Sequence, residues 1–317
     1  MLQKSKIVTL GEILVEFVSH KKNCGLHEIT NFSGPFPSGA PAIFIDQASR
    51  MGANTEIIGG IGNDGFGQCI LKRFKTNNVG TTGITVNSNC PTGTAFVTYY
   101  DNGSRDFIFH LTNTAADSFS LKQALFNPSD TFLHISGSSL GNPIMRQMIM
   151  ETVRNVDKAG GYISCDPNAR ANLMSDAAVI SSLSEVIERS TCLMHSTSDL
   201  EYLFPKVSEE AAIDQLLQSK TKIIALKRGS DGATVIGNGD RFDYEGHFVE
   251  EIDPTGAGDC FGGTFISLLS QGASLYDAGK QANAAGALSV KNRGAMEGNS
   301  SPKDIDDLIN KKYEQIA

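Results

Sequence analysis

Short apolar runs alternate along the chain with stretches whose apolar residues recur every three to four positions. The runs at 55–58, 131–136 and 161–166 are typical of buried strands, and a segment with helical periodicity follows each of them. Strands that alternate with helices form a parallel sheet with helices packed on its faces. The pattern therefore predicts an α/β fold. Residues 6–18 predict its first strand, with a Gly-Glu step in the middle.

A β-rich segment interrupts this alternation. The runs 94–100 and 106–110 flank Asp101-Asn102-Gly103-Ser104, and an Asn-Gly pair between such runs is a strong hairpin signal. A hairpin inside an α/β chain either extends the sheet edge or projects as a lid, and closing lids exclude water in phosphoryl transfer. We interpret 12–36 and 92–112 as a small β lid within a single domain of residues 1–317, because no linker, repeat or low-complexity block divides the chain.

The charge balance narrows the range of partners. The chain has 317 residues, with 27 Lys and Arg against 35 Asp and Glu, and a formal net charge of −8. An acidic chain of this kind argues against binding to nucleic acid or an anionic membrane surface, and no apolar run approaches a membrane span. The 6 cysteines form no CxxC pair, so the sequence favours a reducing cytoplasm over a disulfide framework.

The strongest candidate chemistry lies in the run Asp253-Pro254-Thr255-Gly256-Ala257-Gly258-Asp259. It stands between a strand-like segment at 247–252 and a predicted helix at 260–269. The residues at 256–258 carry almost no side-chain bulk, so backbone N–H groups at the helix start can point at an anion. Asp259 lies beside this anion hole, where a carboxylate could take the proton of a hydroxyl that attacks a phosphate. The alternative is an ordinary helix start with a glycine turn and a capping aspartate.

A second motif supports a function of a different class. Gly137-Ser138-Ser139-Leu140-Gly141 fits the GxSxG pattern of serine hydrolases, with Asp166 and either His195 or His247 as partners of a Ser139 nucleophile. Small residues at strand ends often match this pattern, and it leaves the hairpin unexplained. The chain has no GxxxxGK[ST] run, so any nucleotide must be held without a P-loop.

The order of these motifs resembles that of the PfkB (ribokinase-like) carbohydrate kinases along essentially the whole chain. The run 253–259 is similar to the family's DTxGAGD signature, and the glycine-rich stretch 59–67 resembles its N-terminal element. Residues 38–42 resemble the substrate-side element, and 166–174 the D-x-N-x-R-x-x-L-W run of fructokinases and 2-keto-3-deoxygluconate kinases. The resemblance implies a three-layer α/β/α sandwich with a mostly parallel central sheet and a small β lid.

The resemblance also implies roles at the reacting centre. Gly256, Ala257 and Gly258 would form the anion hole for the γ-phosphate, with Asp259 as the general base on a sugar hydroxyl. Arg170 would contact the transferring phosphate or the sugar. The residues implied on the sugar side are Glu12, Gly39, Asn168 and His110.

The nucleotide side is implied in the same way. Its residues are Ser196, Lys227, Gly229, Gly232 and Asn283. The cofactors would be ATP and Mg²⁺, since the ion offsets charge on the phosphates. Asp253 and Thr255, with the backbone near 292–295, would hold a monovalent cation such as K⁺.

Departures from the family pattern bear on the substrate. Ile43 stands where the substrate-side element has Asn, and the lid reads Phe109-His110-Leu111 where related kinases commonly read Tyr-Arg. The missing arginine disfavours an acidic sugar, because Arg suits bidentate carboxylate recognition. We expect an ATP-dependent kinase acting on a primary hydroxyl of a ketohexose such as fructose or tagatose, and a homodimer formed through the lid. A 2-keto-3-deoxy sugar acid kinase, a nucleoside kinase and a Ser139 hydrolase are the alternatives.

Overall fold

The computed structural model describes residues 2–117, 119–121, 125–169 and 174–314. Nine strands of this described chain form one large sheet. Their order across the sheet is β13 (Asp240–Glu245), β12 (Gly232–Gly237), β11 (Ile223–Lys227), β10 (Cys192–Ser196), β9 (Tyr162–Asp166), β8 (Thr131–Ser136), β1 (Lys6–Leu10), β4 (Thr55–Gly62) and β5 (Ile84–Asn87). The strands from β11 to β5 run parallel, and β12 and β13 add an antiparallel edge.

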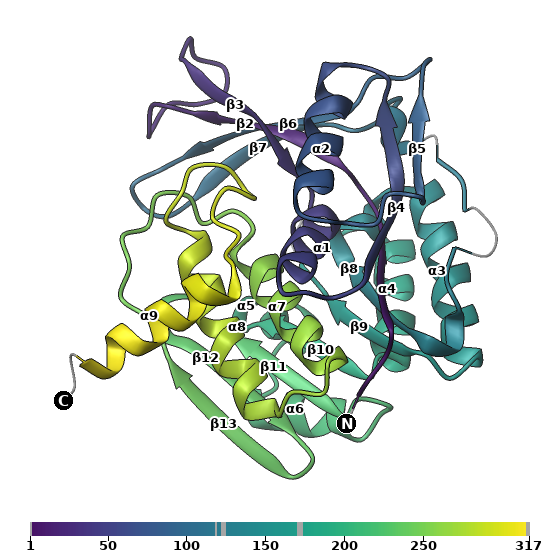
Figure 1. The fold of residues 1–317 in the computed structure, drawn as a ribbon, viewed down its shortest axis with the longest axis vertical. Helices are drawn as coiled ribbons and strands as arrows, with labels where there is room; N and C mark the ends of the chain where they lie inside the picture. The colour runs from purple at the N-terminus through teal and green to yellow at the C-terminus, as the bar shows by residue number, and fades with distance from the viewer. Residues whose placement is uncertain (1, 118, 122–124, 170–173, 315–317) are drawn as a thin grey trace.

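Helices cover both faces of the sheet (Figure 1). One face packs against α1 (Ala40–Arg50), α2 (Gly65–Thr76), α7 (Ala257–Ser270) and α8 (Leu275–Ser289). The other packs against α3 (Pro143–Lys158), α4 (Ala177–Arg189), α5 (Thr197–Leu203) and α6 (Glu209–Leu217), while α9 (Pro302–Glu314) packs on α7 and α8. Successive strand side chains point to opposite faces, so Ile7 and Val8 of β1 enter different cores. The predicted three-layer α/β/α architecture is confirmed.

A second sheet projects from one end of the molecule (Figure 1, upper left). Within the described chain it contains four strands, in the order β3 (Phe32–Ser38), β2 (Leu14–Ser19), β6 (Gly93–Tyr99) and β7 (Arg105–His110). The predicted hairpin is present, because β6 and β7 pair antiparallel around residues 100–104. We call this sheet the lid.

The prediction of one strand over 6–18 was wrong. The chain leaves the large sheet after Leu10 and enters the lid at Leu14, so the run contributes to two sheets. Gly11 lies at the crossing, where a Cβ would come within 2.3 Å of Ser139 Oγ and 2.5 Å of Pro41 Cγ. The apolar pattern marks both strands, but it contains no sign of the change of sheet.

Two other boundaries differ from the prediction. The glycine-rich stretch after residue 58 continues β4 as far as Gly62, paired with β5 from Gly59 to Gly62. Glycine is needed there, because a Cβ at Gly60 would lie 1.9 Å from the carbonyl oxygen of Ala115. The strand-like segment 247–252 forms no strand, and Phe248 is fully exposed in it. None of the helices in the described ranges is long and apolar enough to cross a bilayer.

Candidate active site

The glycine motif places its residues at the start of α7. Gly256 precedes the helix with φ 85° and ψ −1°, a left-handed conformation that favours glycine. A Cβ at Gly256 would lie 2.8 Å from the carbonyl oxygen of Ala295 and 3.1 Å from Ile43 Cγ2. The N–H groups of a first helical turn have no acceptor within their own helix. Ala257, Gly258 and Asp259 all belong to this turn, so the helix start can bind an anion beside a carboxylate.

A lysine lies directly against this helix start. Lys227, at the end of β11, forms an ion pair with Asp166, at the end of β9. Its ammonium nitrogen is 3.0 Å from where a Cβ of Gly258 would lie, so the lysine tip lies directly against this glycine. Burial by itself lowers the pKa of Lys227, but Asp166 and Asp199 outweigh it and raise the pKa above its ordinary value. A permanent positive charge therefore lies beside the predicted anion hole.

The carboxylate of Asp199 organises the strand ends next to Lys227. It accepts from Ser196 N at 2.6 Å, from Ser196 Oγ at 2.6 Å and from Ala169 N at 2.7 Å. The Ser196 hydroxyl thus begins α5 in a capping box. Asn168, next to Ala169, adopts a left-handed φ of 45°. Arg170, which follows, lies outside the described residues.

Two of the predicted sugar-side residues, Glu12 and Asn168, are linked through serines, and a third, Gly39, lies beside them. The Glu12 carboxylate accepts from Ser138 Oγ at 2.8 Å, Ser138 Oγ lies 2.9 Å from Ser136 Oγ, and Asn168 Nδ2 donates to Ser136 Oγ at 3.2 Å. Gly39 lies against Glu12, because a Cβ there would be 2.5 Å from the Glu12 carbonyl oxygen. We call these hydroxyl, amide and carboxyl groups the sugar-side network. Ser136 and Ser138 were missed because the GxSxG pattern directed attention to Ser139.

Three of the predicted nucleotide-side residues lie in the turn after β11 or contact the strand beside that turn. Gly229 and Gly232 have φ values of 58° and 105° in the turn between β11 and β12. Asn283 of α8 is buried and donates from Nδ2 to the carbonyl oxygen of Glu245 at 2.9 Å. This bond anchors the end of β13 to α8.

Comparison with known proteins shows which family of proteins this chain matches. The sequence profile of the pfkB family carbohydrate kinases matches residues 4–303. The chain belongs to the pfkB family of carbohydrate kinases. It is therefore a phosphotransferase, and the sequence-based identification of the family is confirmed.

Individual relatives of this kinase agree with that result. The probable fructokinase-5 of Arabidopsis thaliana is 30% identical over 96% of this chain and 98% of its own. A putative ribokinase II from E. coli, solved with ATP and Mg²⁺, is 40% identical with a TM-score of 0.89, over 97% of this chain and 99% of its own. The fructokinase of Xylella fastidiosa with bound ATP shares the fold, at 23% identity, a TM-score of 0.84, and coverage of 98% and 99%.

The kinase geometry also bears on the hydrolase alternative. Ser139 Oγ donates to Glu12 Oε2 at 2.5 Å, and His195 is fully buried with both ring nitrogens unpaired. The described residues therefore hold no Ser139–His195 hydrogen bond from which a triad could start. The hydrolase alternative is not favoured.

The lid turns two different faces to its surroundings. Strand alternation and register place Glu16, Tyr99 and Phe109 on one face, and Phe17 and His110 on the other. Tyr99 Oη donates to the Asp253 carboxylate, so the first face meets the loop before α7. Burial raises the pKa of Glu16 to about 8, and the negative charge of Asp253 adds to this shift.

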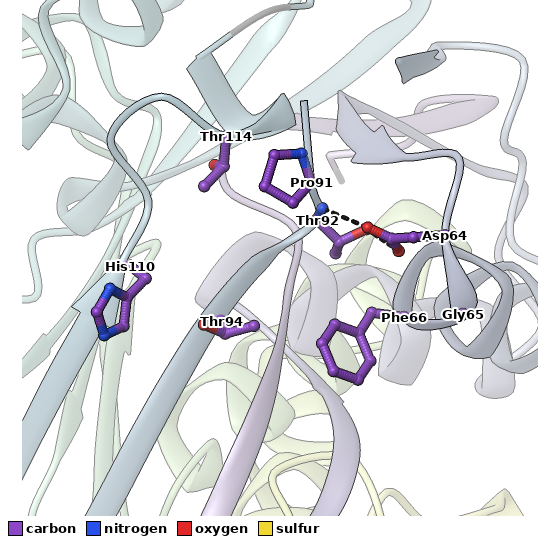
Figure 2. A pocket seen from close by; sticks show the side chains of 8 residues that line it. All are labelled: Asp64, Gly65, Phe66, Pro91, Thr92, Thr94, His110 and Thr114. Carbon is purple, nitrogen blue, oxygen red and sulfur yellow. Dashed lines mark hydrogen bonds between the residues drawn. The ribbon is translucent and has the colours of Figure 1, made fainter. Parts of the chain in front are cut away.

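The structure does not bring His110 to this site. Its ring lies edge-on to Phe96 at 6.2 Å, and Thr94 is its register partner on β6. His110 lines a cavity of about 320 Å³ with Asp64, Phe66 and other residues from the start of α2 and the base of the lid (Figure 2). A one-residue change of register would reverse the face to which His110 points, and the sequence pattern does not fix that register.

Metal binding by side chains alone finds no support. Within the described ranges, no group of three His, Cys, Asp or Glu residues is arranged to hold a metal ion. The Asp253 carboxylate is buried, and its Oδ2 accepts from Gly294 N at 2.9 Å. The backbone of 292–295 thus lies beside Asp253, and hard oxygen donors of this kind suit an alkali cation better than a transition metal.

Proposed function

We propose that this carbohydrate kinase transfers the γ-phosphate of ATP to a primary hydroxyl of a neutral ketohexose, with fructose or tagatose as first candidates. The observation that carries the proposal is the helix start at 256–259, with Asp259 and the Lys227 ammonium beside it. Relatives such as the fructokinase of Solanum tuberosum, 29% identical over 93% of this chain, support the sugar class.

In the proposed reaction, Asp259 accepts the proton of the sugar hydroxyl as its oxygen attacks the γ-phosphorus. The bond to the bridging oxygen of ATP breaks on the opposite side, and ADP leaves with the bonding electrons. The N–H groups of Ala257 and Gly258 stabilise the charge on the transferring group. Removal of one such donor from an enzyme costs on the order of 100-fold in turnover.

Lys227 adds a fixed positive charge to this site. Asp166 restrains the ammonium group in the absence of ligand, so the lysine needs no rearrangement to face a phosphate at the helix start. Mg²⁺ would arrive with ATP and offset the charge on the phosphate oxygens. Arg170 remains proposed as a further phosphate contact, and Ser196, Gly229, Gly232 and Asn283 as the nucleotide side.

A monovalent cation such as K⁺ is proposed at Asp253 and Thr255. The buried Asp253 carboxylate would supply oxygen ligands, and Gly294 of the 292–295 loop lies beside it and donates its N–H to Oδ2. The cation would supply positive charge behind the anion hole. A double-mutant fructokinase from Vibrio cholerae O395 was solved with fructose, ADP and a potassium ion, which is consistent with this proposal.

The sugar-side network supports a polyhydroxylated neutral substrate. Glu12, Ser138 and Asn168 offer acceptors and donors at the carboxyl ends of β1, β8 and β9. Leu111 lies close to Gly93 at the base of the lid and carries no charge. His110 lies on the other lid face, so neither residue supplies a charge for a sugar acid at this site.

We also propose a cytoplasmic homodimer formed through the lid. Ile108 is 42% exposed and belongs to the face with Phe17, Phe96 and His110, which points away from the loop before α7. Apolar rings on a solvent-facing sheet are typical of a protein interface. Light scattering should give twice the monomer mass, and Ile108→Lys should reduce it to the monomer.

A panel of sugars tests the substrate directly. ADP release would be measured with fructose, tagatose, a 2-keto-3-deoxy sugar acid and a nucleoside, each with Mg²⁺ and with or without K⁺. We expect the highest kcat/KM for a ketohexose. A higher kcat/KM for the sugar acid or the nucleoside would overturn the substrate assignment and leave the kinase assignment intact.

A further inference from the structure

Tyr99 joins two parts of the molecule that are distant in sequence. It ends lid strand β6, and its hydroxyl donates to Oδ1 of Asp253, 154 positions along the chain. The same hydroxyl lies 2.7 Å from Thr255 Oγ1. None of the motifs in the sequence includes Tyr99, so this contact adds a residue to the site.

The receiving carboxylate is almost completely buried. Asp253 is 1% exposed, and a carboxylate removed from water needs hydrogen-bond donors around it. Its Oδ1 accepts from Tyr99 Oη and from Thr255 N at 3.0 Å, and its Oδ2 accepts from Gly294 N at 2.9 Å. The lid, the loop before α7 and the 292–295 loop therefore meet at one side chain.

The tyrosine hydroxyl is the donor in its contact with Asp253, because a carboxylate oxygen accepts. A neutral hydroxyl that donates to a carboxylate makes a charge-assisted hydrogen bond, about twice as strong as one between neutral groups.

The contact reaches the anion hole through the backbone. Thr255 directly precedes Gly256, whose left-handed φ of 85° sets the direction of the following N–H groups. A shift of Asp253 or Thr255 therefore changes the direction in which the N–H groups of the first turn of α7 point. We propose that Tyr99 is a positioning residue that ties the lid to the phosphate-binding loop, so that lid position and anion-hole geometry are set together. The inference rests on the proposed ATP-dependent function of that loop.

The neighbouring tyrosine provides a matched control. Tyr100 Oη donates to Asp106 Oδ2 at 2.7 Å within the same hairpin, on the other lid face. Tyr99→Phe and Tyr100→Phe each remove one hydroxyl and keep the ring. Both variants would first be compared with the wild type by near-UV circular dichroism and thermal unfolding.

Hydrogen exchange would follow the amides of 93–110 and 253–259, with and without Mg²⁺ and the non-hydrolysable ATP analogue AMP-PNP. In the wild type and in Tyr100→Phe, we expect the nucleotide to slow lid exchange at least about threefold, because ordering of the loop is passed to the lid. In Tyr99→Phe we expect that protection to disappear. Ligand-free exchange at 253–259 should also be about tenfold faster there, because one charged hydrogen bond is lost.

Three results would overturn the proposal. The first is a Tyr99→Phe variant that matches the wild type in both exchange measurements. The second is a Tyr100→Phe variant that loses the nucleotide protection of the lid to the same extent. The third is a wild-type lid whose exchange does not respond to Mg²⁺–AMP-PNP although calorimetry shows binding. The third result would overturn the proposal even if the Tyr99→Phe variant does not fold.

The same experiment separates this proposal from the proposed function. A wild-type lid that responds to Mg²⁺–AMP-PNP but not to fructose would count against the ketohexose and leave the role of Tyr99 standing. If calorimetry shows no binding of Mg²⁺–AMP-PNP, the ATP assignment fails. The ligand-free hydrogen exchange of 253–259 would then be the remaining test of the role of Tyr99.

Discussion

The two ends of the proposed active site are built from different chemical groups. The proposed phosphate end consists of backbone N–H groups at the start of α7, where a side chain at 256 would collide with the carbonyl oxygen of Ala295. The sugar end consists of side chains from separate strand ends, among them Glu12, Ser138 and Asn168. Backbone geometry leaves one solution for a phosphate, whereas side chains can be exchanged for another sugar without a change of fold.

This difference teaches where specificity resides. The proposed phosphate end lies within seven consecutive residues, 253–259, so a local sequence pattern can suggest it. The sugar end depends on residues 12, 39, 138 and 168, which only the fold brings together. Variants at the phosphate end should therefore abolish turnover, and variants at the sugar end should change substrate affinity.

The largest effect is expected at Asp259. Asp259→Asn keeps the shape and removes the base, so kcat should fall about 1,000-fold, within the range attributed to general base catalysis. Calorimetry should show Mg²⁺–AMP-PNP binding within about threefold of the wild type, because the amides of the first turn are untouched.

A second helix provides the control for Asp259. Asp277 also lies in a first helical turn, and Ser274 Oγ donates to it at 2.6 Å. If Asp259 only caps its helix, both asparagine variants will lose similar stability and neither will lose turnover. Turnover of Asp259→Asn within about threefold of the wild type would remove the assigned base.

The next largest effect is expected at the ion pair between Lys227 and Asp166. Lys227→Met should lower kcat about 100-fold, as for loss of one electrostatic contact to the transition state. It should also lower the free energy of unfolding by about 3–5 kcal/mol, since Asp166 would stay buried without a counter-charge.

A double variant separates these two effects. Lys227→Met with Asp166→Asn removes the unpaired charge, so urea unfolding should show that part of the stability returns. The ADP-release assay should still show low turnover. Recovery of turnover in the double variant would mean that Lys227 acts only through folding.

A smaller effect is expected at the sugar end. Ser138→Ala removes one hydroxyl from the sugar-side network, and the KM for fructose should rise about tenfold with kcat nearly unchanged. Ser139→Ala serves as the matched control, since Ser139 is buried behind Glu12. The hydrolase alternative predicts the reverse, with Ser139→Ala inactive and Ser138→Ala active.

The last prediction concerns stability and its dependence on pH. The pKa of Glu16 is about 8 in the folded chain against 4.5 ordinarily, so folding favours the protonated carboxyl. This contribution is complete below pH 4.5 and is lost as the pH rises through about 8. Without K⁺, Glu16→Gln should match the wild type near pH 5 and exceed it by about 2–4 kcal/mol near pH 9. Parallel urea-unfolding curves at both pH values would contradict the burial of Glu16.

The same contrast explains how much the sequence could predict. The three-layer fold, the hairpin and the helix start at 256–259 follow from local periodicity and from one contiguous motif. Glu12, Gly39 and Asn168 were assigned to the sugar side by resemblance, and the structure brings them together. Their binding of a sugar stays a prediction.

Other features depend on contacts that no local pattern records. The Lys227–Asp166 pair joins residues 61 positions apart, and Tyr99 meets Asp253 across 154. The face occupied by His110 depends on the register between β6 and β7. The division of 6–18 between two sheets occurs after Leu10, where Gly11 lies against Ser139 and Pro41, and both contacts come from distant parts of the sequence.

The late position of α7 in the sequence has a consequence for how the protein folds during synthesis. β1 lies between β4 and β8, so its neighbours are complete only after residue 136 leaves the ribosome. Phe261 and Phe265 of α7 then complete the core on the face of the sheet that α1 and α2 already cover in part. Glu12 is among the first residues made and Asp259 among the last fifth. A chain that stops before α7 therefore leaves part of this apolar face exposed, and exposed apolar surface of this kind is prone to aggregation.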